Sequence, residues 1–178
     1  MLGNDIIDLQ KAGLESNWRR KGYLDKLFNT EEQQQILLSN HPETTLWVFW
    51  SMKEAAYKII NRETTERFYN PKKFICNSNK DGNFVDFEGK IIHIKSVINQ
   101  HFIHTIASST NENLKKIQTT YLENTSTYLS DFNLESNRYI LKKDINGIPN
   151  LVDKANGESH FASVSHHGKY LAIIHTAL

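Results

Sequence analysis

The chain has 178 residues, of which 39% are hydrophobic and 23% are charged, and its formal net charge is +1. This composition is typical of a globular protein with a buried core, in one domain or two small similar halves. The charge balance gives no indication of a nucleic acid or membrane partner, and no apolar run is long enough to span a bilayer. The start of the chain lacks signal-peptide features. The single cysteine, Cys76, excludes an internal disulfide and fits a reducing compartment, so we expect a cytoplasmic protein.

The first half of the chain predicts helices followed by antiparallel strands. A short strand is expected at 3–9, and apolar residues with helical spacing follow at about 14–28. Thr30 and Gln33 have the spacing of a capping box, for a helix that reaches about Ser39 before the break at Asn40-His41-Pro42. A further helix is expected at 47–60. The predicted antiparallel strands are 73–76, 84–87, 91–97 and 102–108.

The second half is less regular. Residues at about 111–136 are polar and predict a linker and a helix. Beyond them we expect strands at 139–141, 149–152 and 170–176, with a turn at Asn146-Gly147. The apolar segments 101–107 and 169–177 are alike, which indicates either a duplicated unit or simply two buried strands.

The segment 47–60 has two distinct faces. The face expected to pack on the core carries Val48, Met52, Ala55, Ala56 and Ile59. The opposite face carries Trp47, Trp50, Lys53, Glu54, Tyr57 and Lys58. Glu54 and Lys58 have the spacing of a surface ion pair, which contributes only about 0.2–0.5 kcal/mol. Large aromatic side chains are unusual on a solvated face, so a binding site is the alternative interpretation.

A second carboxylate, Asp5, lies in the apolar strand at 3–9. Asp at such a position is often a helix cap or a turn residue. Together with Glu54, however, it has the oxygen ligands that Mg²⁺ prefers, completed by water and phosphate. Lys53 and Lys58 would then act as point charges on the same phosphates. This layout is typical of phosphoryl transfer, where catalysis depends on positioning and charge neutralisation.

Two further clusters are polar or basic. The run Ser165-His166-His167-Gly168 precedes an apolar strand and predicts a turn that donates hydrogen bonds to an anion, with a metal site or a structural turn as alternatives. The run Arg19-Arg20-Lys21 is either a solvated helix face or a docking site for an acidic partner.

These motifs together resemble those of the 4′-phosphopantetheinyl transferase superfamily. The segment Gly3-Asn4-Asp5-Ile6 resembles the family signature G-x-D-[IV]. The segment Trp50-Ser51-Met52-Lys53-Glu54-Ala55-Ala56-Tyr57-Lys58 resembles W-[ST]-x-K-E-[AS]-x-x-K, and Ser165-His166 is similar to the family S-H segment. In the two-lobed members the S-H block precedes G-x-D, whereas here it lies near the C-terminus, so the chain resembles a two-lobed member with its lobes in the other order.

The resemblance implies an α+β fold of two similar lobes, each a small antiparallel sheet packed with a helix, related by a pseudo-twofold axis. Residues 1–110 would form the first lobe with the metal and catalytic motifs, and 111–178 the second lobe with the Ser-His segment. A pseudo-dimeric monomer is then favoured over the trimer of the short family members.

The resemblance also implies an activity. A family member transfers the 4′-phosphopantetheine group from coenzyme A to a serine of an apo acyl or peptidyl carrier protein and releases 3′,5′-ADP. Asp5 and Glu54 would bind Mg²⁺, and Glu54 would help to deprotonate the serine. Lys58 and Lys53 would neutralise charge on the phosphates. Ser165 and His166 would contact coenzyme A, and Arg19 and Arg20 would hold the acidic carrier protein.

Two departures from the family pattern affect these expectations. Ile7 stands where many two-lobed members have a second acid, so the metal must rely on Asp5, Glu54 and water, while Asp8 is expected to face away. Ile148 stands where the family has a basic residue that touches the nucleotide; Lys142, Lys143 or Lys154 would have to replace it. A degenerate module that binds coenzyme A or a carrier protein without turnover is therefore the alternative, and a Mg²⁺-dependent nuclease is a weaker one.

Overall fold

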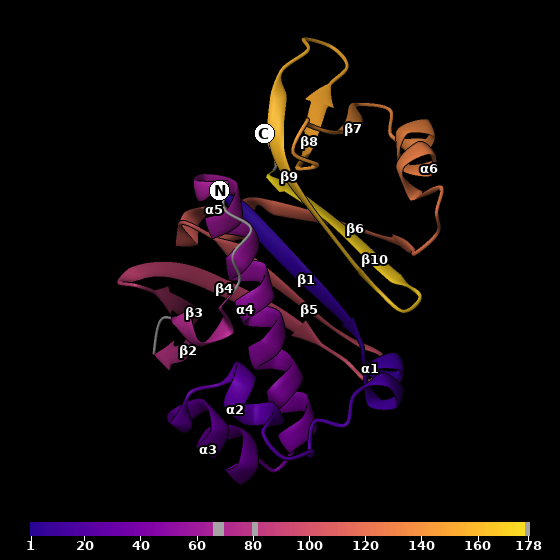
Figure 1. The fold of residues 1–178 in the computed structure, drawn as a ribbon. Coiled ribbons are helices and arrows are strands. Elements are labelled where there is room, and N and C mark those ends of the chain that lie inside the picture. Colours follow the sequence, from indigo (N-terminus) through magenta and orange to yellow (C-terminus); the bar gives the residue numbers. More distant parts are fainter. Residues whose placement is uncertain (66–69, 80–81, 177–178) are drawn as a thin grey trace.

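The computed structural model describes residues 1–65, 70–79 and 82–176, which form two antiparallel sheets with accompanying helices. Figure 1 shows the two sheets as separate lobes that meet along strand β1 (Leu2–Asp8). The expected α+β architecture of two lobes, each a sheet packed with helices, is therefore confirmed.

The first lobe contains a five-stranded sheet in the order β1-β5-β4-β3-β2. Its other strands are β2 (Phe74–Asn79), β3 (Gly82–Phe87), β4 (Lys90–Ile98) and β5 (Phe102–Ser108). Its helices are α1 (Leu9–Glu15), α2 (Tyr23–Leu27), α3 (Thr30–Leu38) and α4 (Pro42–Thr64), with a 3₁₀ turn at Pro71–Lys73. Helix α4 crosses the sheet and packs on β1 and β5 (Figure 1). All five strands predicted in this half are present.

The second lobe repeats this path with different helices. Its sheet has the order β6-β10-β9-β8-β7, which matches the first sheet strand for strand. Helix α5 (Asn111–Lys116) precedes it and packs on β4 and β5 of the first sheet. The elements of the second lobe are β6 (Ile117–Glu123), α6 (Tyr128–Glu135), β7 (Tyr139–Lys143), β8 (Pro149–Asp153), β9 (Ser159–His167) and β10 (Tyr170–Thr176). The two similar sequence segments correspond to β5 and β10, which take equivalent places, so a duplicated unit is favoured. The division between residues 110 and 111 stays a prediction.

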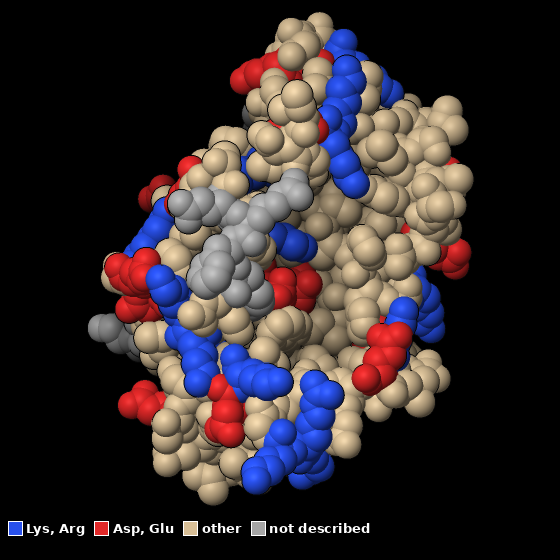
Figure 2. Space-filling view, viewed as in Figure 1, with Lys and Arg blue, Asp and Glu red and all other residues tan. Residues whose placement is uncertain are grey.

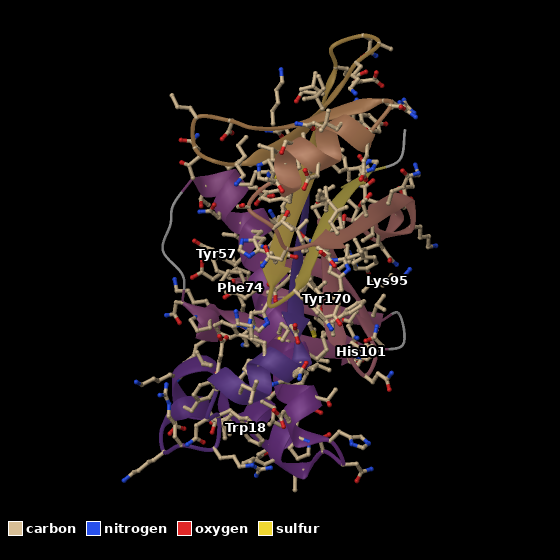
Figure 3. All side chains as sticks on the ribbon, turned by 90° about the vertical axis from the view of Figure 1, so that its right-hand side faces the viewer. Trp18, Tyr57, Phe74, Lys95, His101 and Tyr170 are labelled. Atoms are coloured by element: carbon tan, nitrogen blue, oxygen red, sulfur yellow. The ribbon has the colours of Figure 1, made fainter. Side chains whose placement is uncertain are left out.

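The expected helix at 14–28 is replaced by two shorter helices and a loop. Helix α1 begins earlier because the Asp8 carboxylate accepts hydrogen bonds from the backbone N–H groups of Gln10 and Lys11. Leu14, one of the residues with helical spacing, is 83% exposed. Trp18, which lies in the loop after α1, is buried. Figure 3 shows Trp18 among the helices at the base of the first lobe. The apolar spacing in this segment therefore reflects two separate elements.

Two helix starts also differ from expectation. The capping box of α3 is formed by Asn29 and Glu32, one residue earlier than the predicted pair: Asn29 Oδ1 accepts from Glu32 N at 2.8 Å, and Glu32 Oε2 accepts from Asn29 N at 2.9 Å. The predicted break between the helices is present at 39–41, but Pro42 is the first residue of α4, which therefore begins five residues before the expected start at 47. Proline is well suited to that position because the first helical N–H groups have no partner within the helix.

The strands β6 and β9 were not expected. β6 is an edge strand with polar residues on its outer positions, which conceals the alternation that marks a strand. β9 places Ser163 and Ser165 at buried positions, so it lacks the apolar residues by which a buried strand is recognised. The predicted turn at 165–168 is consequently the end of β9 and a tight hairpin into β10.

The two lobes meet along a contact that we call the seam, formed by β1 on one side and by β9 and β10 on the other. A small apolar cluster of Leu2, Ile106, Leu114 and Ile174 crosses from one lobe to the other. Next to it, the buried Asn4 side chain donates to the carbonyl oxygen of Ala172 in β10 at 3.1 Å. Since burying each large aliphatic side chain stabilises by about 1.5–3 kcal/mol, this cluster helps to hold the lobes together.

Candidate active site at the seam

The G-x-D motif allows β1 to lie unusually close to α4. A Cβ atom on Gly3 would stand 2.2 Å from the carbonyl oxygen of Ala55 and 3.1 Å from Lys58 Cβ. Only glycine permits this approach of strand and helix. Because side chains two residues apart share a strand face, Asp5 also faces α4. This packing explains why Asp5 lies beside Glu54 and Lys58.

Asp5 and Glu54 line one cleft of about 420 Å³. The other residues of its wall are Ile6, Ile7, Ala12, Glu15, Ser16, Tyr23, Trp47, Trp50, His166 and His167. Figure 2 shows the molecular surface hollowed between the two lobes, with acidic and basic groups at the edge of the hollow. The cleft thus receives three carboxylates from the first lobe, Asp5, Glu15 and Glu54, and two histidines from the second.

The surroundings of Asp5 favour a bound cation. Burial and the neighbouring Glu54 charge raise the pKa of Asp5 to about 7, against the opposing effect of Lys58 and of a hydrogen bond from the Ile6 backbone N–H. Two facing carboxylates repel one another, and a divalent ion relieves that repulsion. Within the described ranges no three acidic, histidine or cysteine side chains are grouped to hold a metal. The two carboxylates that are present, Asp5 and Glu54, are the kind of oxygen ligand that suits a hard ion such as Mg²⁺, which keeps water and phosphate oxygens in its shell.

Lys58 connects the two lobes beside these acids. Its Nζ atom donates to the carbonyl oxygen of Asn4 in β1 at 2.5 Å and to that of Val164 in β9 at 3.2 Å. Burial lowers the pKa of Lys58, and the charges of Asp5 and Glu54 oppose that shift. Both hydrogen-bond partners are neutral carbonyl oxygens, and the charges that act on Lys58 are those of Asp5 and Glu54.

Lys53 does not belong to the site, contrary to expectation. Its side chain is fully buried inside the first lobe, where Nζ lies 2.8 Å from each carboxylate oxygen of Glu32. Nζ also donates to the carbonyl oxygens of Pro71 and Phe74, and Glu32 accepts from the Cys76 backbone N–H. Lys53 therefore ties α4 to α3 and β2, and it has no access to a phosphate in the cleft.

The second-lobe wall of the cleft differs from the predicted turn. His166 and His167 line the cleft from the end of β9, but Ser165 is not among the lining residues. Neighbouring strand residues face opposite ways, and the Ser165 side chain is buried, its Oγ atom without a hydrogen-bond partner among the described residues. His166 therefore lies on the cleft and its phosphate contact stays a prediction, whereas the buried Ser165 does not reach the cleft.

Asp8 anchors the tip of the β9–β10 hairpin to the first lobe. The Asp8 backbone N–H donates to His167 Nδ1 at 2.9 Å, and its carboxylate accepts from Lys169 N at 3.3 Å. Gly168 has φ +57°, and a Cβ there would stand 2.2 Å from Asp8 Oδ2. Burial raises the pKa of the Asp8 carboxyl, but backbone hydrogen bonds from Lys11, Lys169 and Gln10 outweigh it and the net shift is downward. The Asp8 side chain faces away from Asp5 and Glu54, as expected. Its contact between the two lobes was not predicted, although the sequence shows the glycine that follows His167.

An aromatic wall completes the cleft. Trp47, Trp50 and Tyr23 line it on the first-lobe side. Trp47 is 6% exposed and packs in the core cluster under α1–α3, so it is not a surface aromatic as the helical wheel indicated. Its indole N–H is buried with no hydrogen-bond partner among the described residues. Such walls suit a ligand that has both an apolar and a charged part.

A family model of the 4′-phosphopantetheinyl transferase superfamily matches residues 1–121. The chain belongs to this superfamily. The matched part contains both acids, Lys58 and all of the first lobe, while most of the second lobe lies outside it. No curated protein matches the chain. Among solved structures, the chain is similar to "Crystal Structure of Holo-ACP-synthase from Plasmodium yoelii", with 18% identity, a TM-score of 0.44, and 60% of this chain and 90% of that chain covered.

The departures from the superfamily pattern have clear positions in the structure. Ile7 is 5% exposed and packs in the apolar cluster with Trp47, so this position adds no carboxylate to the cleft. Ile148 lies in the loop between β7 and β8 and borders a second cavity. Lys154 donates to the Ser136 carbonyl oxygen, and Lys143 lies over the Tyr128 ring.

Arg19 and Arg20 lie apart from the acids. They are exposed and stack over the rings of Trp18 and Tyr23, at 4.2 and 5.3 Å from the ring centroids. With Lys21 they line a separate shallow cleft of about 310 Å³. Tyr23, whose ring lies under Arg20, lines the main cleft. No helix in the part of the chain that the structure describes has the length and apolar character needed to cross a membrane.

Proposed function

We propose that this superfamily member transfers the 4′-phosphopantetheine group of coenzyme A to a serine hydroxyl of an apo acyl or peptidyl carrier protein. The observation that carries the proposal is the convergence of Asp5 and Glu54 with His166 on one cleft at the seam. Membership of the superfamily supports the same chemistry. A pseudo-dimeric monomer is the proposed active form, because one chain contributes both walls of the cleft; a trimer is the alternative.

Asp5 and Glu54 would hold Mg²⁺, which when bound neutralises the pyrophosphate of coenzyme A and orients it. Glu54 accepts the proton of the carrier serine, directly or through water. The serine oxygen attacks the β-phosphorus, the bond to the α-phosphate oxygen breaks, and 3′,5′-ADP leaves with the electron pair of that bond. Lys58 lies beside both acids, and its charge stabilises the negative charge that develops on the phosphates.

The remaining residues bind and orient the substrates. His166 contacts the phosphates from the second lobe, and burial together with the Lys58 charge lowers the pKa of its ring, so it acts mainly as a neutral donor. The aromatic wall at Trp47 and Trp50 excludes water beside the pantetheine arm. Arg19 and Arg20 hold an acidic surface of the carrier protein near the mouth of the cleft. The cytoplasmic location stays a prediction.

The test is the intact mass of apo carrier proteins from fatty-acid, polyketide and peptide synthesis after incubation with the protein, coenzyme A and Mg²⁺. The proposal predicts a gain of one phosphopantetheine group on at least one carrier, abolished by EDTA and by mutation of the carrier serine to alanine. Coenzyme A binding with no mass gain on any carrier would favour the degenerate binding module, which the apolar Ile7 and Ile148 motivate.

A further inference from the structure

A second cavity lies beyond Lys58 along α4. It has a volume of about 290 Å³ and is bordered by α4 on one side and by the second lobe on the other. Its lining residues are Leu2, Tyr57, Lys58, Asn61, Arg62, Asn146, Gly147, Ile148, Pro149, Ser163 and Val164. This described lining contains two cationic side chains, Lys58 and Arg62, and no carboxylate. In Figure 3 Tyr57 marks the level of this cavity on α4, and its ring lies edge-on to that of Phe74.

Arg62 is fixed in place by neutral partners from the second lobe. Its Nη2 atom donates to the carbonyl oxygens of Pro149 at 2.8 Å and Ala162 at 2.6 Å, and Nη1 donates to Asn150 Oδ1 at 3.2 Å. The guanidinium also lies over the Phe161 ring. These bonds orient the group rigidly, and arginine has more N–H donors than they use.

The charge of Arg62 is not neutralised by a bound carboxylate. No salt bridge among the residues that the structure describes includes it. Burial lowers the pKa of Arg62, and the charge of Asp144 opposes that shift. The Asp144 carboxylate, however, accepts hydrogen bonds from the backbone N–H groups of Asn146 and Ile148 and so stabilises the β7–β8 loop. A half-buried cation with carbonyl partners is stabilised when an anion binds beside it.

We infer that this second cavity is an anion subsite, in which Arg62 binds the 3′-phosphate of coenzyme A; the inference rests on the proposed function. Coenzyme A has two separate anionic parts, the pyrophosphate and the 3′-phosphate. The acidic cleft accepts the pyrophosphate only through a cation, whereas the second cavity is already cationic. Lys58 lines the second cavity and lies beside the acids, so one extended ligand can reach both.

Arg62 thereby replaces the basic residue that the sequence lacks at Ile148. Arg62 and Ile148 line the same cavity from opposite lobes. The three lysines considered from sequence are not among the residues that line it: Lys142 and Lys143 are exposed on β7, and Lys154 is bonded to Ser136. The basic group of this cavity therefore lies in the last turn of α4 and not in the β7–β8 loop.

The experiment compares kcat and KM for coenzyme A and for 3′-dephospho-coenzyme A in the wild type, Arg62→Gln and Arg62→Lys. The wild type is expected to have a KM about tenfold lower for coenzyme A, as expected for one charge-assisted contact. Arg62→Gln should raise the KM for coenzyme A about tenfold, leave that for the dephospho form unchanged, and keep kcat. Arg62→Lys should retain part of the preference, and the control Lys142→Gln should behave as the wild type.

If Arg62 had a purely structural role, Arg62→Gln would change the KM for both substrates by the same factor or would change neither. In both cases the preference for coenzyme A would be unaltered, and that result overturns the inference. If Arg62→Gln fails to fold, Ile148→Lys in the Arg62→Lys background serves instead, because it adds charge from the opposite rim and should increase the preference for coenzyme A. An unchanged preference in that variant would also contradict the inference.

Calorimetry with 3′,5′-ADP separates this inference from the proposed function. If no carrier is modified but the wild type binds 3′,5′-ADP and Arg62→Gln binds it about tenfold more weakly, the proposed reaction fails and the anion subsite stands. If carriers are modified but the preference for the 3′-phosphate does not depend on Arg62, the reaction stands and the subsite fails.

Discussion

The two lobes have the same strand order but differ in what lies on their sheets. The first sheet is crossed by α4, a helix of 23 residues, whereas the longest helix of the second lobe is α6, with eight. The long helix brings Glu54 and Lys58 against β1, while the second lobe contributes mainly a wall of strand residues ending at His166 and His167. The two lobes thus share a topology but differ in role. The first lobe carries Glu54 and Lys58 on its long helix, and the second lobe forms the opposite wall of the cleft.

The same division appears within α4 itself. Lys53 is fully buried and Lys58 is half-buried; Lys53 points into the first lobe and Lys58 points to the seam. Lys53 is paired with a carboxylate at 2.8 Å, and Lys58 donates to carbonyl oxygens of both lobes. Position relative to the seam therefore separates a structural lysine from one that can act on a ligand.

The largest expected effect is on activity, from the acids of the first lobe. Asp5→Asn or Glu54→Gln should reduce the rate of phosphopantetheine transfer on the order of a hundredfold to a thousandfold, because each removes a charge from the proposed metal site. Glu63→Gln is the matched control on the same helix, since Glu63 pairs with Lys90 and does not line the cleft. Rates come from the mass assay, with circular dichroism to show that the fold is kept.

The two lysines give the next largest contrast. Lys53→Met should lower the free energy of unfolding by about 3–5 kcal/mol, because it leaves the buried Glu32 carboxylate unpaired. Adding Glu32→Gln should recover part of that loss. Lys58→Met should instead reduce transfer activity about a hundredfold with a smaller loss of stability. Denaturant unfolding and the mass assay measure the two quantities; equal profiles for the two single variants would contradict the division.

The seam should also make stability depend on pH. Burial, assisted by the Lys58 charge, lowers the pKa of His104 to about 4, and the ring lies between Asn4 and Tyr121 of opposite lobes. In the unfolded chain a histidine has a pKa near 6.5, so between pH 6.5 and 4 the unfolded state binds a proton that the folded state does not. The contribution of His104 to stability should therefore fall by about 3 kcal/mol as the pH drops through this range. The raised pKa of Asp5, about 7, acts in the opposite direction, so the His104 contribution has to be measured as a difference between variants.

Unfolding measurements from pH 7 to pH 4 test this expectation. The difference in unfolding free energy between the wild type and His104→Gln should change by about 3 kcal/mol from pH 7 to pH 4, with the wild type losing the stability. The difference between the wild type and His101→Gln should stay constant, since His101 is exposed (Figure 3). An NMR titration in which the His104 ring protonates near pH 6.5 would show that the seam does not exclude the charged form.

The smallest expected effect concerns the contact between β1 and α4. Gly3→Ala should destabilise by about 1–3 kcal/mol and lower activity, because its Cβ would meet the Ala55 carbonyl oxygen and push the strand from the helix. Gly13→Ala is the control: its Cβ would have only an ordinary contact with Glu43, and alanine favours the helix by about 1 kcal/mol. Thermal unfolding of the two variants should shift in opposite directions.

Much of the first lobe was predictable, because its signals are local. The strand periodicity at 84–87 and 91–97 and the apolar stripe of α4 directly reflect which side chains are buried. The motif residues Asp5 and Glu54 were predicted to come together, and the structure places them on one cleft. The second lobe was harder to predict because β6 is polar and β9 buries serines, so neither has a clear alternating pattern.

Errors in the site came from contacts between distant segments. Helical spacing put Lys53 on the face of Glu54, but its partner Glu32 lies in another helix whose position no local pattern reveals. Ser165 and His166 were treated as one unit, although strand geometry sends their side chains to opposite faces. Arg62 had no motif to mark it, and only its contacts with β8 and β9 of the second lobe give it a role.

Metal binding at the seam is the most direct test of the account. Mn²⁺, a spectroscopic substitute for Mg²⁺, would be titrated in the presence of coenzyme A and followed by electron paramagnetic resonance. The account predicts one bound ion in the wild type and in Glu63→Gln, and at least about tenfold weaker binding in Asp5→Asn and in Glu54→Gln. Equal binding in all four proteins would contradict the assignment of Asp5 and Glu54 as the ligands at the seam.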